Sequence, residues 1–260
     1  MNPLWVSKTG LEAQQNRLAT ISNNLANVNT TGFKRDRPIF EDLIYQNVRQ
    51  AGAQTSQDTV LPSGLMLGTG VRTVATQKIH TQGNILQTKN KLDVAVQGRG
   101  LFQIQKPNGD VAFTRTGNFQ LSAEGVIVTA SGYPVQPQIT VPGNAASLTI
   151  GNDGAVSITT PGIAQPQQIG QIQLADFVNP SGLQPVGENL YLETTASGPP
   201  NVANPGNNNT GTLIQGALEG SNVNVVEELV NMIETQRAYE MNSKAISTMD
   251  QMLQFANNQL

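Results

Sequence analysis

The sequence contains no cysteine and only one histidine, His80. Without thiols it can form neither a disulfide nor a cysteine nucleophile, and one imidazole cannot build a zinc site of the Cys or multiple-His type. His80 has no second histidine near it, so we interpret it as a structural polar residue. We expect the chain to hold no metal and no cofactor.

Charge is scarce as well, since Asp, Glu, Lys and Arg make up 13% of the 260 residues and the net charge is −3. That is about half the usual share of charged residues, so we expect no basic surface for nucleic acid. Asn, Gln, Thr, Ser and Gly take the place of charge. A surface of such groups repels its own copies little, which suits a self-packing protein and also a plain secreted β-domain.

Long apolar runs are missing too. No stretch approaches the roughly 18 apolar residues that a membrane-spanning helix needs, so we expect no membrane insertion. Residues 1–8 contain neither a continuous apolar segment nor a small-residue cleavage site, and we therefore expect no cleaved signal peptide. If the protein is exported, we expect it to use another route.

The carboxylates offer no catalytic pair. Glu227 and Glu228 are adjacent, and adjacent residues of a helix point about 100° apart, so the two cannot act together as acid and base. They suit instead the positive end of a helix dipole. We expect the chain not to be an enzyme.

Apolar residues recur every seven positions at both ends of the chain. The spacing predicts an amphipathic helix over residues 4–28 and a second one over residues 222–260, which Asn222 or Asn224 could cap. Both helices carry seams of the coiled-coil type, and we expect the seam residues to form contacts between subunits. They are Leu4, Leu11, Leu18, Ile21, Leu25, Val28, Val225, Leu229, Met232, Tyr239, Ile246 and Leu253.

Between residues 92 and 195 the apolar pattern changes to alternation, which is typical of half-buried strands. Turn-forming clusters separate these strands and favour a compact antiparallel β-domain. Residues 45–64 and 196–211 show no apolar periodicity, so we expect loop or extended chain in both. The alternating pairs include Phe102 and Ile104, Val111 and Phe113, Phe119 and Leu121, and Val156 and Ile158.

Where the first helix is expected to end, residues 23–29 contain four asparagines. Asparagine weakens a helix, and Gly32 can close one in the left-handed conformation. A helix end therefore explains Gly32 but not the asparagines.

This segment resembles the N-terminal signature of the axial proteins of the bacterial flagellum, the family of rod, hook and hook-associated proteins. Residues 82–102, 113–119, 132–136 and 230–242 resemble other stretches of that family in the family's order, so the resemblance covers almost the whole chain. The signature residues are Asn23, Asn24, Asn27, Thr31, Gly32, Phe33 and Lys34.

Within the family, the chain's length and the polar segment after residue 41 resemble the distal rod members more than the hook proteins. The resemblance implies a rod-stiffening insertion over residues 45–64 that contacts neighbouring subunits. Leu101 stands where an aromatic residue is common and Phe113 where tyrosine is frequent, and both keep apolar bulk. The insertion residues of interest are Tyr45, Gln46, Asn47, Gln54, Thr55 and Ser56.

The resemblance further implies an α+β fold. The N- and C-terminal helices would pair as a coiled-coil-like inner domain, with a central antiparallel β-rich domain outside it. The expected divisions are residues 1–34 for the first helix, 35–91 for an extended or loop-rich connection, 92–195 for the β-domain, 196–221 for a second connection and 222–260 for the last helix.

Members of the family are structural, and the resemblance implies a subunit that polymerises helically into a rigid hollow shaft across the periplasm. Such a shaft carries torque from the motor to the hook and forms part of the export channel. The partners implied are copies of the chain itself, proximal rod proteins, the hook protein, the peptidoglycan-ring and outer-membrane-ring proteins and the flagellar type III export apparatus.

Three other interpretations compete. Another axial component, hook or proximal rod, is the nearest, and the segment at residues 45–59 argues against the hook. A secreted β-rich binding module would explain the polar turns but not the seams at both ends. An enzyme acting on the cell wall would need a convergent set of carboxylates, which the sequence does not indicate.

Overall fold

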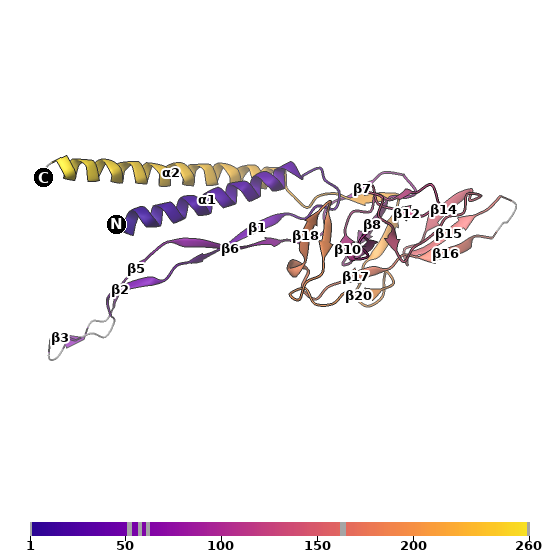
Figure 1. Ribbon diagram of the computed structural model, residues 1–260, viewed down its shortest axis with the longest axis horizontal. Helices are drawn as coiled ribbons and strands as arrows, with labels where there is room; N and C mark the ends of the chain where they lie inside the picture. Colours follow the sequence, from indigo (N-terminus) through magenta and orange to yellow (C-terminus); the bar gives the residue numbers. More distant parts are fainter. Residues whose placement is uncertain (1, 51–53, 57–58, 61–62, 162–164, 259–260) are drawn as a thin grey trace. The chain divides into compact units, whose positions relative to one another are not determined.

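The computed structural model describes residues 2–50, 54–56, 59–60, 63–161 and 165–258. The fold is α+β, as predicted, with a helix near each end and strands between them (Figure 1). The chain divides into two compact units and passes between them four times. We call them the helical unit, which comprises residues 1–26, 36–77 and 224–260, and the β unit, which comprises residues 27–35 and 78–223.

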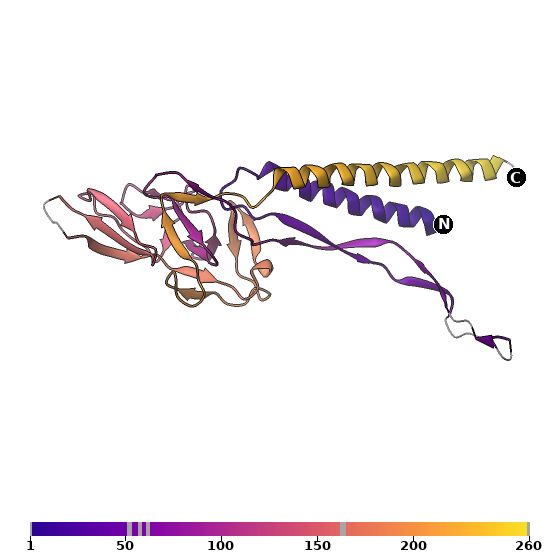
Figure 2. The same cartoon turned by 180° about the vertical axis from the view of Figure 1, so that it is seen from behind.

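The helical unit contains α1 (Asn2–Ala26) and α2 (Val225–Asn258), which pack against each other, as both views show (Figures 1 and 2). The side-chain oxygen of Asn224 accepts a hydrogen bond from the backbone N–H of Val226 at 3.1 Å, so Asn224, not Asn222, caps α2. Both predicted helices are therefore confirmed. In the described part of the chain, no helix combines the length and hydropathy that a bilayer crossing requires.

The buried side chains of the two helices are mostly small or polar, not the leucines of the predicted seam. A Cβ atom placed on Gly10 of α1 would lie 3.2 Å from the side-chain nitrogen of Asn242 of α2, so the helices approach closely at this point. Small residues allow such an approach because no long side chain separates the backbones. The buried residues are Thr9, Ala13, Ile21 and Asn24 on α1 and Glu228 and Thr235 on α2.

The helical unit also contains a ribbon of antiparallel strand pairs. Residues 45–64, where we expected loop or extended chain, are partly strand, because residues 45–49 pair with residues 65–68. All residues of these two strands are exposed, so neither face produces an alternating apolar pattern. The pairs are β1 (Asp36–Asp42) with β6 (Val71–Lys78), β2 (Tyr45–Arg49) with β5 (Leu65–Gly68), and β3 (Gln54–Ser56) with β4 (Thr59–Val60).

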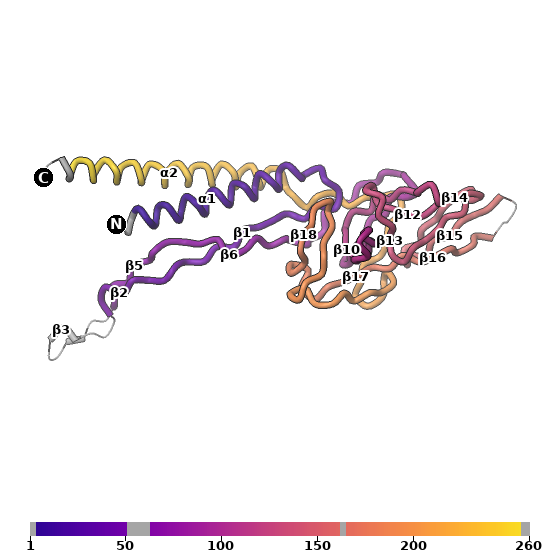
Figure 3. The backbone as a smooth tube through the Cα atoms, in the orientation of Figure 1, coloured from indigo at the N-terminus to yellow at the C-terminus, as the bar shows by residue number. Residues whose placement is uncertain are grey.

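The main sheet of the β unit has seven strands, whose path Figure 3 traces. Its order is β18 (Gln184–Gly187), β19 (Leu190–Leu192), β10 (Val111–Thr114), β9 (Leu101–Gln105), β17 (Leu174–Asp176) and β20 (Asn201–Ala203), with β13 (Val135–Gln136) also pairing with β9. A three-stranded sheet consists of β14 (Ser147–Ile150), β15 (Ala155–Thr159) and β16 (Gln167–Gln171).

Short strand pairs complete the β unit. They are β7 (Ile85–Gln87) with β22 (Ala217–Glu219), β8 (Val94–Gln97) with β21 (Thr212–Gln215), and β11 (Gln120–Leu121) with β12 (Ile127–Val128). A 3-10 turn, η1 (Pro180–Gly182), precedes β18. Residues 196–221, expected to be a connection, thus supply three strands, because their pairing partners lie far away in the sequence.

The apolar core lies between the sheets of the β unit. Phe102 and Phe119 meet edge to face with their ring centres 5.0 Å apart, and Ile104 is fully buried beside them. The predicted alternation therefore identifies much of this core. It fails at Val111 and Leu121, which are exposed although their alternating partners are buried.

Gly117 provides a test of this packing, because a Cβ atom there would lie 1.7 Å from the backbone oxygen of Val94. The backbones of Gly117 and Val94 cannot move apart without breaking the hydrogen bond between them. We therefore expect Gly117→Ala to lower the free energy of unfolding by about 3 kcal/mol or more. Gly143→Ala is the control, since a Cβ there meets no described atom within 4 Å. Urea unfolding followed by circular dichroism measures both, and equal midpoints would contradict the packing described.

Candidate functional site

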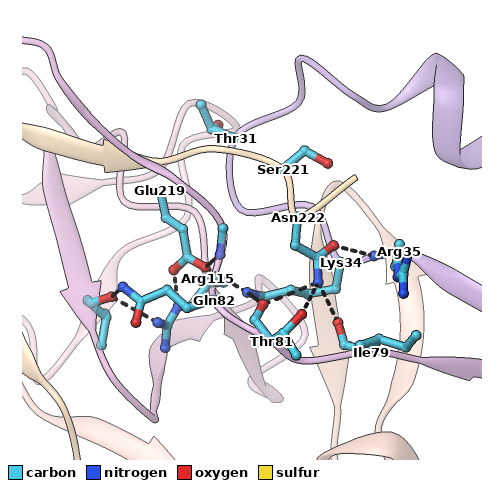
Figure 4. A network of polar contacts seen from close by, with 12 residues as sticks. Thr31, Lys34, Arg35, Ile79, Thr81, Gln82, Arg115, Glu219, Ser221 and Asn222 are labelled. Carbon is cyan, nitrogen blue, oxygen red and sulfur yellow. Dashed lines mark hydrogen bonds and ion pairs between the residues drawn. The ribbon is translucent and has the colours of Figure 1, made fainter. Parts of the chain in front are cut away.

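Glu219, at the end of β22, is the centre of a buried network of polar contacts (Figure 4). Its side chain has an exposed fraction of 0%. One carboxylate oxygen accepts hydrogen bonds from the Lys34 ammonium at 2.6 Å and from the backbone N–H of Gly83 at 2.9 Å. The other oxygen accepts from Nε of Arg115. Two cations and a backbone donor thus replace the water that this carboxylate loses on folding.

Arg115 connects Glu219 with the turn between β8 and β9. Besides the carboxylate, its guanidinium donates to the backbone oxygens of Gly100, of Val96 at 2.8 Å and of Gly98 at 2.6 Å. Its side chain is only 5% exposed. All three guanidinium nitrogens are used in this way, so Arg115 fixes the turn as well as the charge.

Lys34 brings the segment that follows α1 into the same network. Its ammonium donates to the backbone oxygen of Thr81 at 2.8 Å as well as to Glu219. Two residues earlier, the backbone N–H of Gly32 donates to the backbone oxygen of Glu219 at 2.8 Å. Gly32 has a φ of +69°, and a Cβ there would lie 2.8 Å from the backbone nitrogen of Thr116, so both conformation and space require glycine.

Asn222 ties the next part of the chain to this region. Its side-chain oxygen accepts from the backbone N–H of Arg35 at 2.8 Å, and its nitrogen donates to the backbone oxygen of Ile79 at 2.7 Å. Figure 4 shows these contacts beside those of Lys34. Three backbone segments, at residues 35, 79 and 222, are thereby held together by one amide side chain.

The electrostatics follow from burial and pairing. Burial alone would raise the pKa of Glu219, but the charges of Arg115 and Lys34 outweigh it and hold the pKa below its usual range. Burial lowers the pKa of Lys34, and Glu219 offsets only part of that. Burial, together with Lys34, Lys78 and Arg115, lowers the pKa of His80 to about 4. His80 is therefore neutral at pH 7.

A cavity of about 330 Å³ lies beside the network and is lined by Lys34, His80 and Arg115 among others. Arg99, also in the lining, is paired with Asp176 at 3.2 Å. Among the described residues, no three His, Asp or Glu side chains gather as a metal site requires. The charged groups of this region hold backbone segments in place, and the geometry is that of a structural clamp.

The asparagines of the signature segment have local roles that the sequence did not explain. Asn24 and the backbone of Asp36 exchange two hydrogen bonds, at 2.9 and 2.8 Å, within the helical unit. The side-chain oxygen of Asn27 accepts from the hydroxyl of Thr30 at 3.2 Å. Asn23 is exposed. These contacts hold the backbone after α1 in turns that apolar residues could not support.

Phe33 and Thr31 complete the segment. Phe33 is buried, and the Lys78 ammonium lies 5.1 Å from the centre of its ring. The backbone oxygen of Thr31 accepts from the hydroxyl of Thr116 at 3.1 Å and from the side chain of Asn189 at 3.2 Å. The signature residues are thus divided between the two units, and among them Gly32 and Lys34 donate hydrogen bonds to Glu219.

The predicted subunit contacts are only partly covered in the single chain. Ile21 is buried, and Leu4, Leu11, Leu18, Leu25, Val28, Met232 and Ile246 are half-buried. Four of the predicted contact residues on α2 are exposed, with exposed fractions of 40% for Val225, 43% for Leu229, 40% for Tyr239 and 57% for Leu253.

Of the predicted insertion, Tyr45, Gln46 and Asn47 are exposed on β2, and Gln54, Thr55 and Ser56 form β3. Residues 51–53, 57–58 and 61–62 of the insertion lie outside the described residues.

Sequence reasoning missed the centre of the network. Arg115 lies in a stretch that resembles the family, but the sequence predicted no role for it. No role was predicted for Glu219 either. The available signal was the single carboxylate at an alternating position of an otherwise apolar strand, Ala217–Glu219. An inward-facing charge of that kind needs a partner.

Comparison with known proteins identifies the family. Residues 4–34 match the family described as "Flagella basal body rod protein", residues 95–158 "Flagellar hook protein FlgE/F/G D1 domain" and residues 214–259 "Flagellar basal body rod FlgEFG protein C-terminal". The flagellar basal-body rod protein FlgG of Buchnera aphidicola subsp. Schizaphis graminum is 61% identical, over 96% of each chain. This chain belongs to the flagellar basal-body rod protein family. Lys34, Arg115 and Glu219 come from three different matched segments.

Two further relatives refine the placement within the flagellar basal-body rod family. FlgG of Caulobacter vibrioides is 49% identical over 100% of this chain and 99% of its own length. The flagellar basal-body rod protein FlgF of the same organism is 35% identical over 94% of this chain and 91% of its own. The chain is therefore more similar to the FlgG branch than to the FlgF branch.

Glu219→Gln tests the importance of the buried charge. The amide cannot balance Lys34 and Arg115, so we expect the free energy of unfolding to fall by about 3–5 kcal/mol. Glu124→Gln, at an exposed carboxylate of the same unit, should change it by less than about 0.5 kcal/mol. Chemical unfolding at pH 7 compares the two, and a small effect at Glu219 would show that the network is dispensable.

His80 predicts a loss of stability in mild acid. The folded chain keeps it neutral down to about pH 4, whereas the unfolded chain protonates it near pH 6.5. Between these values the unfolded state binds more protons, so stability falls by roughly 3 kcal/mol as the pH is lowered. His80→Asn removes this contribution. Unfolding free energies at several pH values should therefore give a flatter profile for the variant, and identical slopes would refute the assignment.

Proposed function

We propose that this chain is a structural subunit of the flagellar distal rod. It polymerises helically into a rigid hollow shaft that transmits torque from the motor to the hook and forms part of the export channel. Relatives named flagellar basal-body rod protein FlgG support this proposal, because they align with 96–100% of the chain.

The observation that carries the proposal is the exposed apolar surface of α2. Near the start of the helix, Val226, Leu229, Val230 and Ile233 have exposed fractions of 70%, 43%, 50% and 50%. They recur at helical spacing along one broad side of α2, while the buried positions of the same helix are polar. An apolar patch of this kind marks a protein interface, and copies of the chain are the occupant we propose.

The free energy gained by burying these side chains of α2 does not by itself account for stable polymerisation. Burying the exposed half of four such side chains contributes about 3–6 kcal/mol, which is half of the roughly 1.5–3 kcal/mol for each side chain buried in full. Association costs about 4–15 kcal/mol in lost translational and rotational freedom. The gain is at most similar to the cost, so stable polymerisation needs more contact area than this stretch of α2 provides.

The β2–β5 ribbon offers that additional area. Tyr45, Val48, Leu65, Met66 and Leu67 are 46–57% exposed. Apolar side chains on a strand pair that is exposed on both faces are costly in water. We propose that this part of the insertion packs on neighbouring subunits and thereby restricts their motion, as the stiffening role of the insertion requires.

Further parts of the proposal concern arrangement and partners. The helices form a coiled-coil-like inner domain, and the β-rich region forms an outer one. The proposed divisions of the chain are residues 1–34, 35–91, 92–195, 196–221 and 222–260. Proximal rod proteins, the hook protein, the peptidoglycan-ring and outer-membrane-ring proteins and the type III export apparatus are the proposed partners. The rod crosses the periplasm.

Basal bodies test the proposal. We expect a strain lacking this chain to yield rods truncated before the hook, and the native gene to restore them. A double variant, Leu229→Asn with Leu253→Asn, removes exposed apolar groups that the proposed contacts need, so it should also give truncated rods and no motility. Gln236→Asn, at an exposed polar position of α2, is the control. Electron microscopy measures rod length, and complete rods in the deletion strain would overturn the proposal.

A further inference from the structure

The β unit contains a second open cavity of about 330 Å³, none of whose lining residues lines the cavity beside Glu219. Of its twelve lining residues, nine end in a neutral hydroxyl or amide group, one is the acid Glu188, and none is Lys or Arg. The lining therefore combines neutral donors and acceptors with apolar surface. A ligand that matches this lining carries hydroxyl or amide groups beside apolar C–H surface.

Hydrogen bonds between three segments hold the wall of this cavity in place. The backbone oxygen of Thr31 accepts from the hydroxyl of Thr116 at 3.1 Å and from the side-chain nitrogen of Asn189 at 3.2 Å. The hydroxyl of Thr114 donates to the backbone oxygen of Asn189 at 2.9 Å. The polar groups are thus positioned before any ligand arrives, which lowers the entropic cost of binding.

Other polar groups of the lining remain available to a ligand. Within the described part of the chain, the side chains of Asn118, Ser131 and Glu188 make no hydrogen bond or ion pair, and neither does the hydroxyl of Tyr133. Tyr133 also contributes a ring, which packs partly against the apolar core. The cavity therefore offers hydrogen-bond donors and acceptors beside an aromatic ring. A sugar can bind to such a surface through its hydroxyl groups and its C–H face.

Glu188 provides an independent observation. It occupies the turn between β18 and β19 with a φ of +54°, and the next residue, Asn189, has a φ of +58°. Hairpin turns with two such residues normally use Asn or Gly, because other side chains cost about 1–2 kcal/mol there. Glutamate is thus a poor choice for the turn itself. A strained residue at the rim of a preformed cavity indicates a use for its side chain.

We propose that this cavity binds a neutral saccharide, with the Glu188 carboxylate accepting a hydrogen bond from a sugar hydroxyl. Asn118 and Ser131 supply further bonds to the rim of the sugar, and Tyr133 lies against it. The carboxylate and the lack of Lys or Arg in the lining exclude an anionic ligand as the preferred one. This proposal rests on the β unit alone and is independent of the rod assignment.

Saturation-transfer NMR on the full chain tests the proposal with two neutral probes, chitotriose and cellotriose. We expect transfer to at least one of them. Glu188→Gly should weaken its binding about tenfold, the loss of one charge-assisted hydrogen bond, and should raise the melting temperature by relieving the turn. Asn118→Ala, which leaves the turn intact, should also weaken binding.

Lys89→Gly is the matched control, because Lys89 also has a positive φ, +62°, and does not line the cavity. It should raise the melting temperature and leave saccharide binding unchanged. The proposal is overturned if neither trisaccharide shows transfer, or if Glu188→Gly and Asn118→Ala both bind as the unmodified chain does.

Discussion

Glu219 is a carboxylate with no access to water, and a buried ion costs several kcal/mol unless partners replace its hydration. In this chain the partners are separated from it by 185 residues for Lys34 and by 104 for Arg115. The end of β22, the segment after α1 and the segment after β10 must therefore meet before the charge is stabilised. Because β22 precedes α2 and Lys34 follows α1, one ion-pair network anchors the β-unit segments that lead to both helices.

The helical unit is built on a different principle. The β unit buries large apolar residues such as Phe102 and Ile104, whereas the helices bury Thr9, Asn24 and Thr235 and expose leucines and valines. Polar groups buried on a helix are stabilised by partners, as the reciprocal bonds between Asn24 and Asp36 show. The apolar residues stay available for other surfaces, which is what the proposed polymer needs. The same sequence thus combines a β unit with a large apolar core and a helix pair whose apolar side chains are partly exposed.

These differences explain what the sequence could and could not predict. Heptad spacing located α1 and α2, but not the face they share, since hydropathy does not identify Thr235 as buried. Alternation found the core around Phe102 but missed the β2–β5 ribbon, where both faces are exposed and no alternation arises. The signature residues Gly32 and Lys34 were found by resemblance. Their partner Glu219 was not, because no local spacing connects charges so far apart in the chain. The subunit contacts remain predictions.

The network carries two cations and one carboxylate, so an excess positive charge remains inside the β unit. Another buried carboxylate would balance it but would add its own desolvation cost. Backbone oxygens take that place instead: Thr81 accepts from Lys34, and Val96, Gly98 and Gly100 accept from Arg115. Burial is the main cause of the lowered pKa of Lys34 and of His80, whose pKa falls to about 4, and neighbouring cations lower both further. The neutral state of His80 therefore follows first from its burial, and the cations Lys34, Lys78 and Arg115 add to it, because a further positive charge beside them would be repelled.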